Sequence, residues 1–218
     1  MVNNKNQTVP DNMAGAEMIT GVILAGGMGR RMNGVDKGLI QLHGRDLISY
    51  VIDALEPNVN RIIVNANRNL DAYEKYGVSV IKDSIEGYQG PLAGVEAGMA
   101  AATTPWIYTC PCDSPLQSTG LLPWMWRELS GTTADIGLAF DGQRTHPVFS
   151  LVKTGLLQSL RDYLGSGERK IDRWFAQHEL IKIDCSQYVN SFININTEEE
   201  RLDAESLVSG GRAAGSEN

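Results

Sequence analysis

The chain has 218 residues, 42% of them hydrophobic and 21% charged, a composition typical of a soluble globular protein with one sizeable domain. Its formal net charge of -7 argues against non-specific binding to nucleic acid, so any anion site must be a local basic pocket. No apolar run reaches the roughly 18–20 residues of a membrane span, and the polar N-terminus lacks the apolar core of a signal peptide. We therefore expect a cytoplasmic protein without a membrane or nucleic-acid partner.

The two ends of the chain differ in composition from the rest. Residues 1–18 and 205–218 are rich in Asn, Ser, Gly and Glu, and they show little hydrophobic periodicity. We expect both to be disordered tails. Because no repeat or linker interrupts the remaining sequence, we expect a single domain at residues 19–204.

The three cysteines, Cys110, Cys112 and Cys185, are too few for a disulfide framework. Cys110 and Cys112 are two positions apart, and a single C-x-C pattern is a weak signal for structural zinc. We expect reduced thiols, as in a cytoplasmic protein.

Between the tails, short apolar runs alternate with segments of helical periodicity. The predicted strands lie at residues 21–26, 61–67, 78–83, 106–113, 134–142, 145–153 and 191–196. The predicted helices lie at residues 46–57, 70–77, 90–102, 154–167, 168–179 and 197–205, and Thr197 with Glu200 forms a capping box for the last. This alternation predicts an α/β fold: a single-domain, Rossmann-like, mostly parallel sheet flanked by helices on both faces.

A glycine-rich, basic turn follows the first predicted strand, between Leu24 and Gly38. In parallel sheets, ligands bind at the carboxyl ends of the strands, and glycines there let backbone N–H groups approach a phosphate. Arg30, Arg31 and Lys37 would then neutralise phosphate charge, whereas the alternative is a plain turn with a solvated basic edge. The stretch lacks the Gly-Lys-Ser/Thr of a P-loop and the Gly-x-Gly-x-x-Gly pattern, so a Rossmann dinucleotide site is disfavoured.

A carboxylate, Asp113, ends the predicted strand at residues 106–113. A carboxylate at the end of a buried strand is costly unless it is paired or binds a metal. Asp113 is therefore either a Mg²⁺ ligand, since Mg²⁺ prefers one or two carboxylates with substrate phosphates, or the N-cap of a helix after Pro115. Sequence position alone leaves both roles open.

Asn65 and Asn67 end another predicted strand. Their amide groups offer both donors and acceptors, which suit a base or ribose edge. Asparagine is also common in turns, so a turn without a ligand is the alternative.

The glycine-rich turn also resembles a known signature. LAGG at residues 24–27, RRM at 30–32 and DK at 36–37 are similar to the motif of nucleotidyltransferases of the sugar-phosphate pyrophosphorylase type. Across about residues 19–204, the chain resembles more closely the molybdenum cofactor guanylyltransferase family. The further matching segments are VNANR, IKDS, GPLAG, CPCDSP, HPVFSLV, GERK and FININTEEE.

This resemblance implies a reaction. The terminal phosphate of molybdopterin, or of its molybdenum-loaded form, would attack the α-phosphate of GTP, forming the guanine dinucleotide cofactor and releasing pyrophosphate. A phosphate monoester has a second pKa of about 6, so it is largely ionised at neutral pH and needs no strong general base. The implied cofactor is Mg²⁺, with Mn²⁺ as an alternative. The implied partners also include cofactor-synthesis or target molybdoenzyme proteins in transient contact.

The resemblance also implies roles for individual residues. Arg31, Lys37 and Asp113 would be catalytic, and Asp113 would hold the metal. The residues implied to bind the nucleotide are Leu24, Ala25, Gly26, Gly27, Lys37, Asn65, Asp83, Gly90, Gly94 and Asp113. Those implied to bind the pterin are Asn194, Asn196 and Arg169, and His146 is a weaker candidate that is otherwise a loop histidine before Pro147.

Two other functions stay open at this point. One is a cytidylyltransferase or sugar-phosphate nucleotidyltransferase of the same fold. The other is a non-catalytic carrier of a nucleotide or cofactor. Lys37 and Asp113 together argue against a carrier, because a carrier need not hold a catalytic metal.

Overall fold

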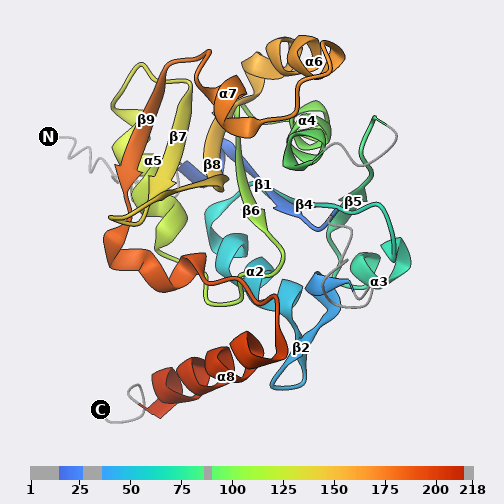
Figure 1. The fold of residues 1–218 in the computed structure, drawn as a ribbon, viewed down its shortest axis with the longest axis vertical. Coiled ribbons are helices and arrows are strands. Elements are labelled where there is room, and N and C mark those ends of the chain that lie inside the picture. The colour runs from blue at the N-terminus through green and yellow to red at the C-terminus, as the bar shows by residue number, and fades with distance from the viewer. Residues whose placement is uncertain (1–14, 27–35, 86–89, 214–218) are drawn as a thin grey trace, which may run out of the picture.

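The computed structural model describes residues 15–26, 36–85 and 90–213. A seven-stranded sheet runs through its centre, in the order β5-β4-β1-β6-β8-β7-β9 (Figure 1). Its strands are β1 (Ile19–Leu24), β4 (Arg61–Asn65), β5 (Ser79–Ile81), β6 (Trp106–Pro111), β7 (Ile136–Phe140), β8 (Thr145–Lys153) and β9 (Leu180–Asp184). β8 pairs antiparallel with both of its neighbours, and the other neighbours pair in parallel. The predicted α/β fold with a mostly parallel sheet is confirmed.

Helices cover both faces of the sheet, as predicted, and each face has its own apolar core (Figure 1). One core joins the sheet to α2 (Leu47–Leu55), α3 (Leu70–Glu74) and α5 (Leu121–Ser130). The other joins it to α4 (Pro91–Ala101), α6 (Leu157–Gly165) and α7 (Ile171–Phe175). Neighbouring side chains of β1 are buried in different cores, Ile23 in the first and Val22 in the second. Because both faces of this strand are buried, its sequence is an unbroken apolar run.

A small hairpin and the last helix form a third apolar cluster beside the main sheet. The hairpin consists of β2 (Gln41–Leu42) and β3 (Arg45–Asp46), and the last helix is α8 (Glu198–Ala213). Their buried contact joins Leu42, Leu47, Ile195 and Ala204. Short 3₁₀ helices complete the chain: η2 (Lys37–Leu39), η3 (Glu56–Asn58), η4 (Thr154–Leu156) and η5 (Ser186–Phe192).

The prediction of a strand at residues 191–196 is wrong. Its first residues belong to η5, and the edge of the sheet is instead occupied by β9, a strand that the sequence reasoning did not identify. The alternation of apolar and Asn residues still separates buried from polar positions. Ile195 is buried, whereas the side chains of Asn194 and Asn196 belong to a polar cluster described below. Alternation indicates which side chains are buried, but it does not choose the strand that a segment pairs with.

One helix was not predicted from the sequence, and another is longer than predicted. α5 was not identified, although Leu121, Met125 and Leu129 follow helical spacing and are buried in the first core. α8 continues to Ala213, beyond residue 205, where the helical pattern was expected to end. The domain bounds at residues 19 and 204 stay a prediction. Within the described ranges, no helix is both long and apolar enough to cross a membrane.

Candidate active site

A cavity of about 300 Å³ lies at the carboxyl ends of β1, β4 and β6. These three parallel strands are neighbours, so the residues that end them meet at one edge of the sheet. Backbone hydrogen bonds continue past the strand ends, from the Ala25 N–H to the Asn65 carbonyl at 2.8 Å and from the Cys112 N–H to the Leu24 carbonyl at 3.2 Å. The residues that line the cavity come from these ends and from the turns around them: Leu24, Ala25, Gly26, Asp36, Lys37, Asn65, Asp83, Gly90, Pro91, Gly94, Pro111, Cys112, Asp113, Val148 and Asn194.

Asp113 is the centre of a polar cluster at one side of this cavity. The Lys37 ammonium group donates to Asp113 Oδ2 at 2.8 Å, and the Asn194 amide group donates to Asp113 Oδ1 at 2.9 Å. Lys37 also donates to Asn196 Oδ1. Asp113 is only 5% exposed, and these donors stabilise its buried charge. The next helix along the chain begins at Leu121, so the alternative role of Asp113 as an N-cap after Pro115 is wrong.

A second polar cluster lies at another side of the cavity, where β4 ends. Asp83 Oδ1 accepts from the Asn65 amide group at 2.9 Å, and Asp83 Oδ2 accepts from the Asn67 amide group at 2.8 Å. The Asp83 N–H in turn donates to Asn67 Oδ1 at 3.0 Å. These bonds fix the side chain of Asn65, which is 2% exposed, against the lining of the cavity.

Helix α4 approaches Asn65 closely because it carries Gly94. A Cβ atom at this position would lie 2.4 Å from Asn65 Oδ1 and 2.8 Å from Leu24 Cδ2, closer than atoms in contact allow. The helix begins at Pro91, as the sequence predicts, after Gly90 with a φ of 75°. Both glycines therefore let the backbone of α4 form part of the cavity wall.

Asp36 is a lining residue that the sequence reasoning did not assign to the site. Its carboxylate is 4% exposed and accepts from the Tyr73 hydroxyl and, at 3.2 Å, from the Asn69 amide group. Burial raises the pKa of the Tyr73 phenol far above its ordinary value, which keeps this donor protonated. Because Asp36 precedes Lys37, its anchoring fixes the start of η2. Asp36 directly precedes Lys37 in the DK motif, and this position could have assigned it to the site from the sequence.

Other predicted site residues lie elsewhere. Arg169, in the connection between α6 and α7, donates to the backbone carbonyl of Leu164 at 2.8 Å. His146, on β8, has Nε2 2.7 Å from Asp141 Oδ2, and its ring stacks on Phe192 with centroids 4.2 Å apart. Neither side chain is among the described residues that line the cavity, so their role toward a pterin stays a prediction.

The structure thus gathers most of the predicted nucleotide site in one place. Gly27 and Arg31 fall outside the described residues. Every other residue predicted to bind the nucleotide lines the cavity, and so does Asn194 from the predicted pterin site. Asn196 joins the same polar cluster through Lys37.

Comparison with known proteins identifies relatives of this chain. The family model of the MobA-like NTP transferase domain matches residues 21–181. The chain is 42% identical over 183 residues to a molybdenum cofactor guanylyltransferase from Shewanella halifaxensis, with 84% of this chain and 92% of that protein covered. A molybdenum cofactor guanylyltransferase from Shewanella piezotolerans is 44% identical over 183 residues, with 84% and 90% covered.

A solved structure supports the fold. The crystal structure of molybdopterin-guanine dinucleotide biosynthesis protein A from Archaeoglobus fulgidus matches with a TM-score of 0.75, covering 88% of this chain and all of that chain. The two sequences are 22% identical, so this likeness shows a shared fold.

Proposed function

This chain belongs to the MobA-like NTP transferase family, and on that premise we propose that it transfers GMP from GTP to the molybdenum cofactor. The observation that carries the proposal is that Lys37 and Asp113, in contact with each other, line one cavity together with Asn65, Asp83 and Asn194. A phosphate oxygen of the pterin substrate attacks the α-phosphorus of GTP, and the bond from this phosphorus to the bridging oxygen breaks. Pyrophosphate leaves with the electron pair of that bond.

Lys37 stabilises the negative charge of this reaction. Phosphoryl-type transfer depends mainly on positioning and on charge neutralisation, because the attacking phosphate is already ionised. The Lys37 side chain is 29% exposed at the cavity, so its ammonium group can exchange its contact with Asp113 for a contact with phosphate oxygens. The backbone of Gly26, which also lines the cavity, lies beside the same phosphates. Arg31 stays a predicted contributor.

The chemistry of Asp113 fits a divalent metal. Each of its two oxygens accepts one hydrogen bond and keeps a further lone pair for a cation. Among the residues that the structure describes, no three His, Cys, Asp or Glu side chains gather as a metal cluster. Mg²⁺ suits this arrangement, because it binds through one or two carboxylates together with substrate phosphates and water. We propose that Asp113 holds Mg²⁺, or Mn²⁺ in its place, which supplies charge neutralisation at the phosphates.

Asp83 and Asn65 recognise the nucleoside in this proposal. The Asp83 carboxylate has acceptor capacity beyond its bonds to Asn65 and Asn67. Guanine presents two neighbouring donors, N1–H and the N2 amino group, whereas adenine and cytosine each present a single amino donor on the corresponding edge. A carboxylate at this position favours guanine. We propose that Asn194 and Asn196, whose side chains contact Asp113 and Lys37, bind the second substrate.

The experiment that tests this function measures pyrophosphate release. Purified protein is mixed with Mg²⁺ and molybdopterin, and GTP, CTP and ATP are compared at equal concentration. We expect release with GTP alone. Release with CTP would overturn the assignment of the base, and GTP binding without release from any nucleotide would favour a carrier.

A further inference from the structure

The segment Asn194–Asn196 contacts the proposed active site without belonging to the sheet, and Asn194 lines the cavity. Asn194 donates to Asp113, Asn196 accepts from Lys37, and Ile195 between them is fully buried. The Ile195 N–H also donates to the Asp113 carbonyl at 2.9 Å. Because no described strand includes these residues, strand pairing does not fix their conformation, and other contacts must do so.

A capping box provides such contacts directly after the segment. Glu200 Oε2 accepts from the Thr197 N–H at 3.0 Å, and Thr197 Oγ1 accepts from the Glu200 N–H at 3.1 Å. The same Glu200 oxygen also accepts from the Asn196 N–H at 2.5 Å. Besides Thr197, the partner in an ordinary capping box, Glu200 therefore also binds the backbone of Asn196, whose side chain contacts Lys37.

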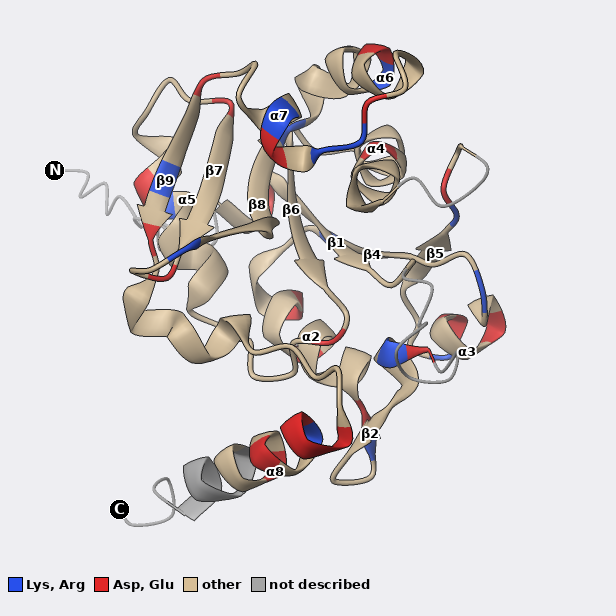
Figure 2. Cartoon of the chain, in the orientation of Figure 1, with Lys and Arg blue, Asp and Glu red and all other residues tan. Residues whose placement is uncertain are grey.

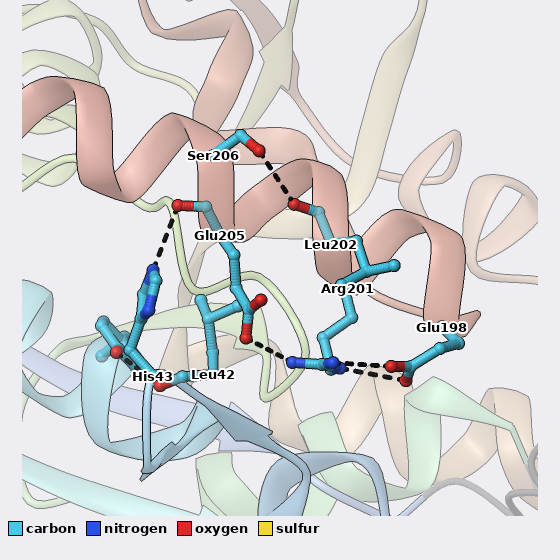
Figure 3. A network of polar contacts seen from close by, with 8 residues as sticks. Leu42, His43, Glu198, Arg201, Leu202, Glu205 and Ser206 are labelled. Atoms are coloured by element: carbon cyan, nitrogen blue, oxygen red, sulfur yellow. Dashed lines mark hydrogen bonds and ion pairs between the residues drawn. The ribbon is translucent and has the colours of Figure 1, made fainter.

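Helix α8 is in turn held on the β2–β3 hairpin. Leu42 and Ala204 are buried in one apolar cluster, and His43 Nε2 lies 3.1 Å from the Glu205 carbonyl (Figure 3). Arg201 pairs with Glu198 at 2.6 Å and with Glu205 on the same helix (Figure 3). The first turn of α8 holds three acidic residues, Glu198, Glu199 and Glu200, and Figure 2 colours the start of this helix mainly as Asp and Glu. Their negative charge suits the positive end of the helix dipole.

The hairpin continues from the element that carries Lys37. η2 begins at Lys37, and β2 begins at Gln41, four positions later in the chain. The packing of α8 on the hairpin therefore fixes both partners of the Lys37–Asn196 contact, one through η2 and the other through the capping box.

We propose that Glu200 is a positioning residue for the second substrate. Its carboxylate fixes the Asn196 and Thr197 amides, and this holds the side chains of Asn194 and Asn196 toward the attacking phosphate or its pterin. The inference rests on the proposed function and adds to it a residue that does not itself touch substrate.

The first test separates the two substrates kinetically. Glu200→Ala should raise KM for molybdopterin about tenfold and change KM for GTP by less than about twofold, because the lost cap orders Asn194 and Asn196, which the proposed function assigns to the second substrate. Glu200→Gln should have the wild-type KM for molybdopterin. The Asn196 and Thr197 N–H groups both donate to one carboxylate oxygen of Glu200, and an amide oxygen can replace it. Glu199→Ala is the matched control, since it removes the same charge from the same helical turn. Equal increases of both KM values, failure of Glu200→Gln to restore KM, or an equal effect of Glu199→Ala would overturn the proposal.

The second test does not depend on catalysis. Hydrogen exchange of the Asn196 and Thr197 amides should be about tenfold faster in Glu200→Ala and unchanged in Glu200→Gln and Glu199→Ala. Unchanged exchange in Glu200→Ala would refute the positioning role. If the wild-type protein released no pyrophosphate, the proposed function would fail, and the exchange data would still decide whether Glu200 orders this segment.

Discussion

The Lys37 ammonium nitrogen lies 2.8 Å from Asp113 Oδ2, although the two residues are 76 positions apart in the sequence. Lys37 is carried by η2, and Asp113 follows the central strand β6. The Asp113 side chain is 7% exposed, so water contributes little to stabilising its charge, and Lys37 and Asn194 provide the compensating donors. Through these two residues, the end of β6 is connected to the segment that carries Asn194 and Asn196.

Lys37→Ala should reduce the rate of pyrophosphate release by about 10²–10³, the range found when one donor to developing charge is removed. The reason is the loss of the cation that stabilises the phosphates. Lys75→Ala, an exposed lysine at the end of α3, is the control and should keep full activity. A Lys37→Ala enzyme with wild-type kcat would show that another group neutralises the triphosphate.

Asp113→Ala should abolish turnover and leave the fold intact. The free energy of unfolding should fall by about 1–3 kcal/mol, because Lys37 and Asn194 lose their shared acceptor. Asp135→Ala is the control, since it removes another carboxylate paired with a lysine, Lys153 at 2.7 Å, that does not line the cavity. That control should retain activity. Urea unfolding together with pyrophosphate release checks both, and Mg²⁺-dependent turnover by Asp113→Ala would refute the metal assignment.

Gly94→Ala should raise KM for GTP by about tenfold or more, because the new methyl group displaces Asn65 from the cavity wall. Gly98→Ala lies one turn further along α4, where a Cβ would lie 2.7 Å from Val22 Cγ1. It should lower the melting temperature and leave KM for GTP unchanged. Equal KM values for the two variants would contradict the role of Gly94 in nucleotide binding.

Glu96 connects the Asp83 loop to α6 through a buried carboxylate. It is 2% exposed, accepts from the Ser84 hydroxyl, and accepts from Arg161 Nε at 2.7 Å. Arg161→Ala should lower the free energy of unfolding by about 2–4 kcal/mol, because it leaves the buried Glu96 carboxylate without the cation that compensates its charge. Glu96→Ala should cost less, about 1–2 kcal/mol, since it removes the buried charge and leaves Arg161, which is half exposed to water. Denaturant unfolding of both variants measures this order, and the reverse order would contradict it.

Alkaline pH should destabilise the protein through its buried thiols. Burial raises the pKa of Cys185 from its ordinary value to about 12, and it also raises the pKa of Cys110. Between the ordinary pKa and the raised one, the unfolded chain loses thiol protons that the folded chain keeps, so stability falls as pH rises. The midpoint of urea unfolding should therefore be lower at about pH 10.5 than at about pH 8, which lies below the ordinary thiol pKa. An unchanged midpoint would contradict this prediction.

Much of the lining of the cavity could be predicted from the sequence. Leu24, Asn65 and Asp113 stand at or just after the ends of buried apolar runs, and the ends of neighbouring parallel strands meet at one edge. The capping box of Thr197 and Glu200 was equally predictable, because its partners are three positions apart on one helix.

The positions of Arg169, His146 and residues 191–196 could not be predicted in this way. Arg169 is turned toward the backbone of its own α6–α7 connection, and His146 is held by Asp141 and Phe192. The alternation in residues 191–196 predicted a strand, but β9 occupies the edge of the sheet beside β7. In each case the outcome depends on which distant segment packs against the residue.

The sequence by itself determined the apolar runs that form β1, β4 and β6, the glycines that let the backbone approach a ligand, and the local helix cap. Each of these depends on side-chain type and spacing within a few residues. The tertiary structure alone decided that Lys37 meets Asp113 and Asn196, and that α8 rests on the hairpin that follows Lys37. Such contacts form between segments far apart in the chain, and they are selected by the burial of apolar surface and the pairing of charge over the whole fold.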